Sequence, residues 1–133
     1  MLHLFFLFAS GVPWSELIDQ AVLEERQGRY QDAERTLRRA LQAAKEESRS
    51  QRDLASTLNN LGGVQALLGE FLAAEKNLNL ALRHLRQTGN SDSAWTFPLN
   101  HLGIVYRRTG RLQLAEQAYR QVLAERVRPS TTA

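Results

Sequence analysis

The sequence has no cysteine, only three prolines and a single methionine. Without cysteine, no disulfide, thiol nucleophile or thiolate metal site can form. Clustered charge is also absent, because 17 basic and 14 acidic residues are interspersed along the chain. This pattern is typical of a solvated surface, and the doublets Arg38-Arg39 and Arg107-Arg108 are too few to form a nucleic-acid footprint. We therefore expect no nucleic-acid partner for this single domain.

Residues 1–12 form an apolar leader that is too short for a transmembrane span, which needs about 20 residues. It resembles the apolar core of a signal peptide, with Ala9-Ser10-Gly11 as a cleavage site, but it lacks the basic n-region. Two interpretations stay open. A truncated signal peptide would direct periplasmic or secreted export, whereas an apolar segment packed on the first helices would fit a cytoplasmic protein. Residues 129–133 are expected to be a disordered tail.

A period of 41 residues organises the rest of the chain. Gly28, Gly69 and Gly110 are spaced by this interval, and each lies between two amphipathic segments. A fixed period in this range is the signature of stacked helical repeats. Glycine suits such turns because a helix often ends in a left-handed residue that only glycine adopts cheaply. The pattern predicts an all-α fold of three antiparallel helix pairs.

The apolar spacing predicts six helices, which we place at about 14–27, 31–47, 51–68, 71–87, 93–109 and 112–126. The second and fourth share the same apolar offsets, beginning at Ala33 and Ala74. Pro98 complicates the fifth helix, which begins either near Pro98 or at Ser93 with a kink. We favour the kink, because Trp95 aligns with the apolar Leu54 one period earlier.

The best-preserved repeat places Leu99, Leu102-Gly103 and Tyr106 on its first helix. On these residues, and on the turn glycines, the chain resembles a tetratricopeptide repeat protein over residues 14–126. The resemblance implies a right-handed superhelix, an α-solenoid over residues 13–128, with repeats at about 14–48, 55–89 and 96–128. Small residues recur where paired helices must approach closely: Ala21, Gly62 and Gly103 on first helices, and Ala33, Ala74 and Ala115 on second helices.

The chain departs from the usual family pattern in its period and at its two ends. The common period is about 34 residues. The 7 extra residues here add about two helical turns without rotating the buried faces, which is similar to the kinesin-light-chain-like class. Gln20 and Glu24 are polar where the family is apolar, so we expect the first helix to meet solvent as a cap. We expect exposed apolar surface on the last helix at Leu114, Ala118 and Val122, favouring self-association, a partner, or a place in a longer array.

In this family the first helices line a concave groove, and the resemblance implies that a peptide binds there. Asparagine amides both donate and accept hydrogen bonds, and arginines bind carboxylates. The alternative is that these polar residues are merely solvated. The candidate groove residues are Ile18, Val22, Ser56, Asn59, Asn60, Gly63, Leu67, Phe97, Asn100, His101, Ile104, Arg107 and Arg108.

The sequence shows no catalytic constellation. His3, His84 and His101 are isolated from one another, and no nucleophile is paired with a base. We therefore expect no enzyme activity, cofactor or metal. The sequence predicts a non-catalytic protein–protein interaction scaffold that binds a peptide or a partner protein in the groove. The alternative is a structural or regulatory fragment of a larger assembly that self-associates through its uncapped C-terminal helix.

Overall fold

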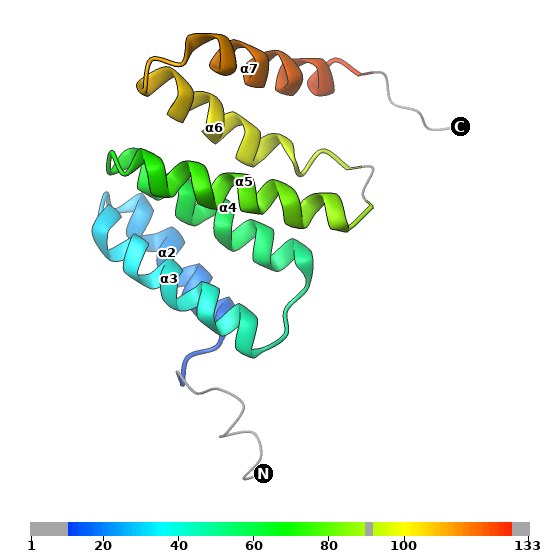
Figure 1. Cartoon of the computed structure of the whole chain (residues 1–133). Coiled ribbons are helices and arrows are strands. Elements are labelled where there is room, and N and C mark those ends of the chain that lie inside the picture. Colours follow the sequence, from blue (N-terminus) through cyan, green and yellow to red (C-terminus); the bar gives the residue numbers. More distant parts are fainter. Residues whose placement is uncertain (1–10, 90–91, 129–133) are drawn as a thin grey trace.

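The computed structural model describes residues 11–89 and 92–128, which form helices and turns without a strand in these ranges. The predictions for residues 1–10, including His3, and for the tail at 129–133 lie outside the described residues. The helices, labelled as in Figure 1, are α2 (Trp14–Arg26), α3 (Tyr30–Glu46), α4 (Gln51–Leu67), α5 (Phe71–Gln87), α6 (Thr96–Arg108) and α7 (Leu112–Arg126).

The six helices form three antiparallel pairs that stack in chain order (Figure 1). Within the pairs, α2 packs on α3, α4 on α5 and α6 on α7. Between the pairs, α3 contacts α4, and α6 contacts both α4 and α5. The prediction of an all-α helical-repeat solenoid is confirmed.

The three turn glycines end the first helix of each pair in the same way. Gly28, Gly69 and Gly110 have φ of 73°, 79° and 79°, a conformation that a side chain makes costly. The amide of the next residue then donates back to a carbonyl five positions earlier, as Arg29 does to Glu24 at 2.8 Å. This bond satisfies a carbonyl that the helix end leaves unpaired.

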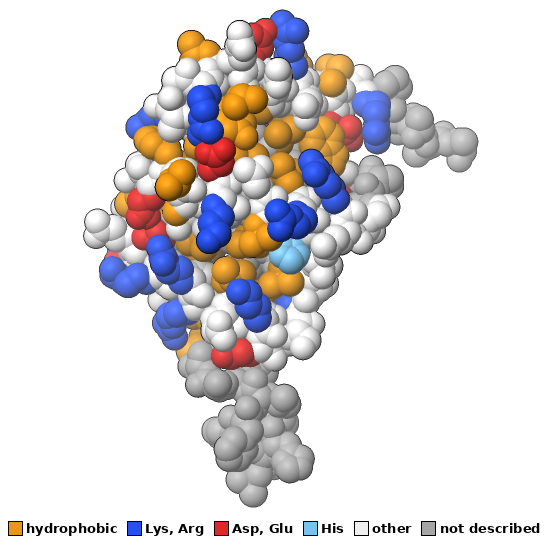
Figure 2. Space-filling model, viewed as in Figure 1, with side chains coloured by type: hydrophobic (Ala, Val, Ile, Leu, Met, Phe, Trp, Pro, Cys, Tyr) orange, Lys and Arg blue, Asp and Glu red, His pale blue; other side chains and the backbone are white. Residues whose placement is uncertain are grey.

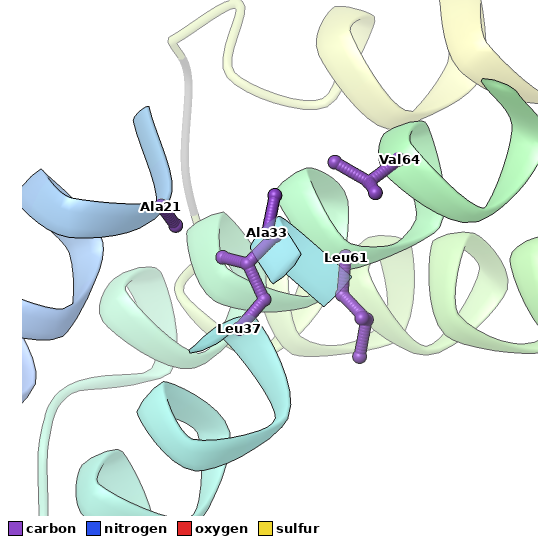
Figure 3. Close-up of a cluster of buried hydrophobic side chains, with 5 residues drawn as sticks. All are labelled: Ala21, Ala33, Leu37, Leu61 and Val64. Atoms are coloured by element: carbon purple, nitrogen blue, oxygen red, sulfur yellow. The ribbon is translucent and has the colours of Figure 1, made fainter. Parts of the chain in front are cut away.

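The core repeats with the helices. Figure 3 shows the first apolar cluster, where Ala21 of α2, Ala33 and Leu37 of α3, and Leu61 and Val64 of α4 meet. The second cluster is built one period later, from Ala74 and Leu78 of α5 with Leu102 and Val105 of α6, together with Ala66. Each cluster therefore joins one helix pair to the first helix of the next.

Glycine allows the closest helix approach inside the second and third pairs. A Cβ atom on Gly62 would lie 2.6 Å from Cγ of Leu78, and one on Gly103 would lie 2.6 Å from Cε1 of Tyr119. The alanines at the matching positions, Ala21 on α2 and Ala74 on α5 among them, are buried. Small side chains thus bring the backbones of paired helices together.

The predicted kink in the fifth helix is wrong. α6 begins at Thr96, so Pro98 lies in its first turn, where a missing N–H leaves no helical hydrogen bond unmade. The preceding residues form a turn instead, in which the Thr96 amide donates to the Ser93 carbonyl at 3.0 Å. α6 therefore has 13 residues, against 17 in α4.

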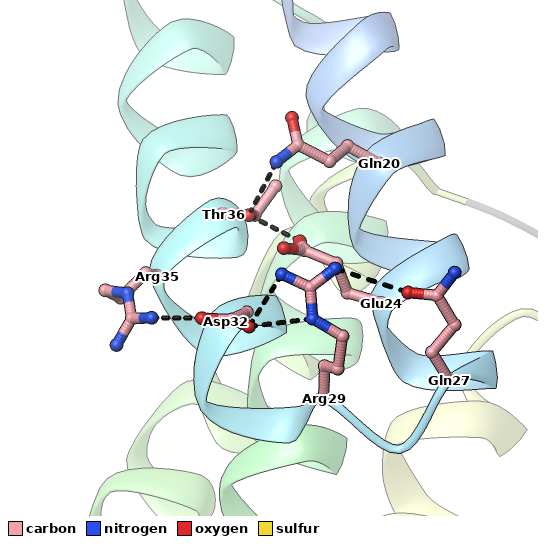
Figure 4. Close-up of polar contacts among 7 residues, drawn as sticks. All are labelled: Gln20, Glu24, Gln27, Arg29, Asp32, Arg35 and Thr36. Carbon is pink, nitrogen blue, oxygen red and sulfur yellow. Dashed lines mark hydrogen bonds and ion pairs between the residues drawn. The ribbon is translucent and has the colours of Figure 1, made fainter.

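Glu24 does not meet solvent, although Gln20 does. The Glu24 side chain lies between α2 and α3, and Thr36 Oγ1 donates to its Oε1 at 2.6 Å (Figure 4). One period later, Asn77 donates to the buried Gln65 in the same way, at 2.8 Å. The expectation for Glu24 was wrong because a hydroxyl on the facing helix provides the hydrogen bond that a buried carboxylate needs.

The last helix is also more buried than we expected. Ala118 and Val122 are buried, since they lie on the side of α7 that packs on α6. Leu114 is exposed as expected, and the other large exposed apolar residues on α7 or at its end are Leu112, Leu123 and Val127.

Candidate functional site

A pocket of about 270 Å³ lies between the N-terminal halves of α4 and α6. It gathers three of the predicted groove residues, Ser56 and Asn59 from α4 and Phe97 from α6. Sequence reasoning missed its remaining lining residues, which are Arg52, Asp53, Ala55, Leu85, Ala94 and Pro98. We name this the α4–α6 pocket.

The late start of α6 shapes this pocket. Asp92 stands one period after Gln51, the first residue of α4, yet α6 begins only at Thr96. The chain from Asp92 to Trp95 turns instead of coiling, and the Asp92 carboxylate accepts a hydrogen bond from the Ala94 amide at 3.0 Å. Asp92 also forms an ion pair with Arg52 of α4. These contacts hold Arg52, Asp92 and Ala94 in place, and we call these three residues the rim of the pocket.

His101 of α6 and Asn59 of α4 connect these two helices beside the pocket. His101 Nδ1 lies 2.9 Å from Asn59 Oδ1, and its ring packs on Gly63, where a Cβ atom would lie 3.0 Å from the ring. Burial lowers the pKa of His101, which favours the neutral ring with Nδ1–H as the donor. Asn59 then keeps its amide NH₂ for a ligand, whereas His101 and Gly63 are occupied by this contact.

The remaining candidates on α6 form a line that leads away from the pocket. Asn100 and Ile104 are half-buried, and Arg107 and Arg108 are exposed in the last turn. Phe97 and Arg107 are separated by about 15 Å along the helix axis, at 1.5 Å per residue. The arginines therefore belong to the far end of this face, where the Arg108 guanidinium lies 5.6 Å from the Phe71 ring centre.

The other candidates are distributed unevenly over α2 and α4. Ile18 is half-buried and packs against the core, so its side chain is not available to a ligand. Val22 and Leu67 are exposed, and Asn60 is half-buried. The first pair thus adds little to the α4–α6 pocket.

A second pocket, of about 500 Å³, also uses the segment before α6. It was not predicted, because its lining comes from α5, Leu99 of α6, Gln121 of α7 and the segment before α6 rather than from groove positions. The alignment of Trp95 with Leu54 was the one signal that pointed to this region. Its lining residues are Leu82, Leu85, Arg86, Gly89, Asp92, Trp95, Leu99 and Gln121.

Charges are dispersed over the face of the molecule that Figure 2 shows, with basic side chains scattered among apolar and acidic ones. In the described part of the chain, no three His, Cys, Asp or Glu side chains gather where they could hold a metal ion. Among the helices of residues 11–89 and 92–128, none is long and apolar enough to cross a membrane.

The two junctions between helix pairs carry different charges at one repeat position, the residue after the turn glycine. Arg111 donates two hydrogen bonds to Glu75 of α5, at 3.0 and 2.7 Å. At the first junction Glu70 stands in this position and faces Glu34 of α3. Contact with Glu34 and burial raise the pKa of Glu70, while contact with Glu70 and with Arg38 lowers the pKa of Glu34.

A search of curated proteins finds no match to this chain. The family model described as "Tetratricopeptide repeat" matches it twice, at residues 17–87 and 53–124. The two overlapping matches cover all six helices in part or in whole. The likeness of the chain to the kinesin-light-chain-like class stays a prediction. From the matches and the stacked helix pairs, the chain belongs to the tetratricopeptide repeat family.

Proposed function

We propose that this chain is a non-catalytic module that binds an extended peptide segment of a partner protein across α4 and α6. Tetratricopeptide repeats generally mediate protein–protein interactions and are typically non-catalytic. The observation that carries the proposal is the α4–α6 pocket, which combines exposed Phe97 of α6 with polar side chains of α4.

The pocket suits one side chain of a peptide. Its volume of about 270 Å³ falls just below the range of about 300–1,000 Å³ that is usual for small-molecule sites. Leu85 and Ala55 supply apolar walls, and the free amide of Asn59 can donate to a peptide carbonyl. An apolar side chain in the pocket, with its backbone against Asn59, satisfies both kinds of group.

The same face suggests where a carboxylate of the peptide would lie. Arg107 lies about 15 Å from Phe97 along α6, and an extended peptide covers that distance in about five residues. We therefore expect ligands with an apolar anchor and, about five residues away, a carboxylate that contacts Arg107 or Arg108. Asn100 and Ile104 lie between the two ends.

Peptides selected on the wild-type chain from a random displayed library provide the test. Ser56→Arg fills the pocket and Phe97→Ser removes its exposed ring, so each should weaken peptide binding at least about tenfold in fluorescence anisotropy. The double variant Asn59→Ala with Asn100→Ala should also lose affinity. Leu72→Ser is the matched control, since Leu72 is an exposed apolar residue on α5, outside the α4–α6 pocket.

Unchanged affinity in both Ser56→Arg and Phe97→Ser would show that the peptide binds elsewhere. A loss in Leu72→Ser equal to that in Phe97→Ser would show that any exposed apolar residue serves, and the pocket would then have no special role.

A further inference from the structure

The last helix, α7, exposes a face whose equivalents on α3 and α5 are covered by the first helix of the next pair. Leu37 of α3 packs with Leu61 and Val64 of α4, and Leu78 of α5 packs with Leu102 and Val105 of α6. The residues of α7 one period after Phe71, Leu78 and Leu82 of α5 are Leu112, Tyr119 and Leu123. Leu112 and Leu123 are 64% and 59% exposed, whereas their counterparts at both internal junctions are partly buried.

The first helix presents the complementary face. Leu23 of α2 occupies the repeat position of Val64 and Val105, the residues that receive the preceding pair. Leu23 is 54% exposed, while Val64 and Val105 are 1% and 0% exposed. Around it, Gln20 and Asp19 are exposed polar residues. Each half of an inter-repeat contact is therefore present once more, at opposite ends of the described stack.

The polar pairs of the internal junctions recur at these ends with matching chemistry. Glu75 binds Arg111 at the second junction. The equivalent residues at the two ends are Glu116 on α7, one period after Glu75, and Arg29 before α3, two periods before Arg111. Both are exposed. Glu116 pairs with Arg120 on its own helix, and Arg29 pairs with Asp32 and donates to Gln27 close by in the chain. Exposed pairs of this kind cost little to exchange.

A second polar pair of an internal junction also has its equivalents at the two ends of the stack. Asn59 of α4 contacts His101 of α6 across the second junction. The residues at the equivalent end positions are Asn100 on α6 and Asp19 on α2. An amide and a carboxylate are complementary, since the amide NH₂ donates and the carboxylate accepts.

We propose that a second copy of this chain stacks head-to-tail on the first, with α2 of one copy on α7 of the next, in the same 41-residue register. Leu23 packs against Tyr119 and Leu123, and Arg29 pairs with Glu116. The contact uses different surfaces on the two copies, so it can add further copies and form an open filament. The assembly shares Asn100 with the proposed peptide face but uses none of the residues that line the α4–α6 pocket.

The matched ends favour a second copy over an unrelated partner. An unrelated protein would need only the apolar face of α7, and nothing would then require Leu23 and Arg29 to lie at the complementary positions of α2. A symmetric contact between two α7 helices would likewise leave α2 unused. Only a head-to-tail contact between two copies uses the complementary residues of both α2 and α7.

Sedimentation velocity over a wide range of concentration tests the stacking. The wild-type chain should exceed the mass of a dimer as concentration rises. Leu23→Asp and Leu123→Asp should each stay monomeric, because each blocks one of the two surfaces. Mixed together they should form a 1:1 dimer, since each supplies the surface that the other lacks. This dimer also shows that both variants are folded. Leu72→Asp, at an exposed leucine outside both faces, should assemble like wild type.

Charge reversal tests the register. Arg29→Glu and Glu116→Arg should each weaken association at least about tenfold, and the chain carrying both changes should recover most of the loss. A wild-type chain that stays monomeric at every concentration overturns the proposal. So does a Leu23→Asp chain that still forms dimers, because it would indicate a symmetric α7 contact. Failure of the double reversal to recover would refute the stated register.

Discussion

The first and second helix pairs meet through two facing carboxyls, whereas the second and third meet through an arginine and a carboxylate. The backbone register is the same at both junctions. Glu70 and Arg111 each follow a turn glycine, and each faces the glutamate of an Ala-Glu pair on the second helix of the preceding pair. At the first junction, Oε1 of Glu70 is buried and has no hydrogen-bond partner as a carboxylate. A hydrogen bond between the carboxyls of Glu70 and Glu34 raises the pKa of Glu70.

The difference shows that the repeat fold and the strength of each junction are set by different residues. Apolar clusters of the same design hold both junctions together. The charged residue after the turn then adds attraction at the second junction and repulsion at the first. The stack is therefore expected to be weaker between α3 and α4 than between α5 and α6 at neutral pH.

The largest effect should come from filling the close approach inside the second pair. Gly62→Ala places a Cβ against Leu78, which is fully buried and cannot move aside. Overpacking of this kind costs about 1–3 kcal/mol. Gly103→Ala meets the ring of Tyr119, which is half-buried on α7 and can rotate. Its cost should be offset by the roughly 1 kcal/mol that alanine gains over glycine in a helix.

Urea unfolding of both glycine variants measures this contrast in the free energy of unfolding. Equal losses in Gly62→Ala and Gly103→Ala would show that the two pairs are packed alike and would contradict the contrast.

Exchange of the junction charges should have the next largest effect. Arg111→Glu should lower the melting temperature, since it recreates at the second junction the facing carboxyls of the first. Glu70→Arg should raise it, since an arginine there can pair with Glu34. Arg39→Glu, at an exposed position of α3, is the control for a change of net charge. A Glu70→Arg chain less stable than wild type would show that the facing carboxyls stabilise the first junction.

The pH dependence of stability should differ between the junctions by a smaller amount. Folding raises the pKa of Glu70, so its stabilising contribution is complete below its ordinary pKa and is lost as pH rises through the folded value. The lowered pKa of Glu34 has the opposite sign, and its contribution is lost as the pH falls. Glu70→Gln should therefore become more stable relative to wild type as pH rises from acidic to neutral.

Unfolding free energies of wild type, Glu70→Gln and Arg111→Gln at a series of pH values provide the measurement. The Arg111→Gln difference should stay nearly flat across the range in which the Glu70→Gln difference changes. A flat Glu70→Gln difference would mean that the two carboxyls do not share a proton.

The smallest effect should come from the rim of the α4–α6 pocket. Arg52 and Asp92 are about half exposed, and exposed ion pairs contribute at most about 1 kcal/mol. Arg52→Ala should therefore leave the melting temperature almost unchanged. A loss of several kcal/mol in thermal unfolding would indicate that the segment before α6 helps to hold the second and third pairs together.

The six helices and their turns could be predicted because apolar spacing and turn glycines are local signals. The bounds of α5 and α7 agree with the prediction at both ends. The start of α6 was missed because Pro98 is compatible with both a kinked helix and a first turn. Glu24 was misplaced because its burial depends on Thr36, a partner on another helix that no local pattern reveals.

The candidate site was predictable only in part. Ser56, Asn59 and Phe97 were found because repeat position determines which side of a first helix they occupy. Arg52 and Ala94 were missed, since the late start of α6 brings them to the pocket. The contact between His101 and Asn59 was missed because it joins side chains from neighbouring repeats, although both residues were predicted to face the groove.

Backbone amide NMR of the chain with a selected peptide shows whether the peptide binds in the α4–α6 pocket. We expect the largest shift changes to cluster in the first half of α4 and in α6, around Ser56, Asn59 and Phe97. Changes confined to the outward surfaces of α3 and α5, with α4 and α6 unaffected, would contradict this expectation.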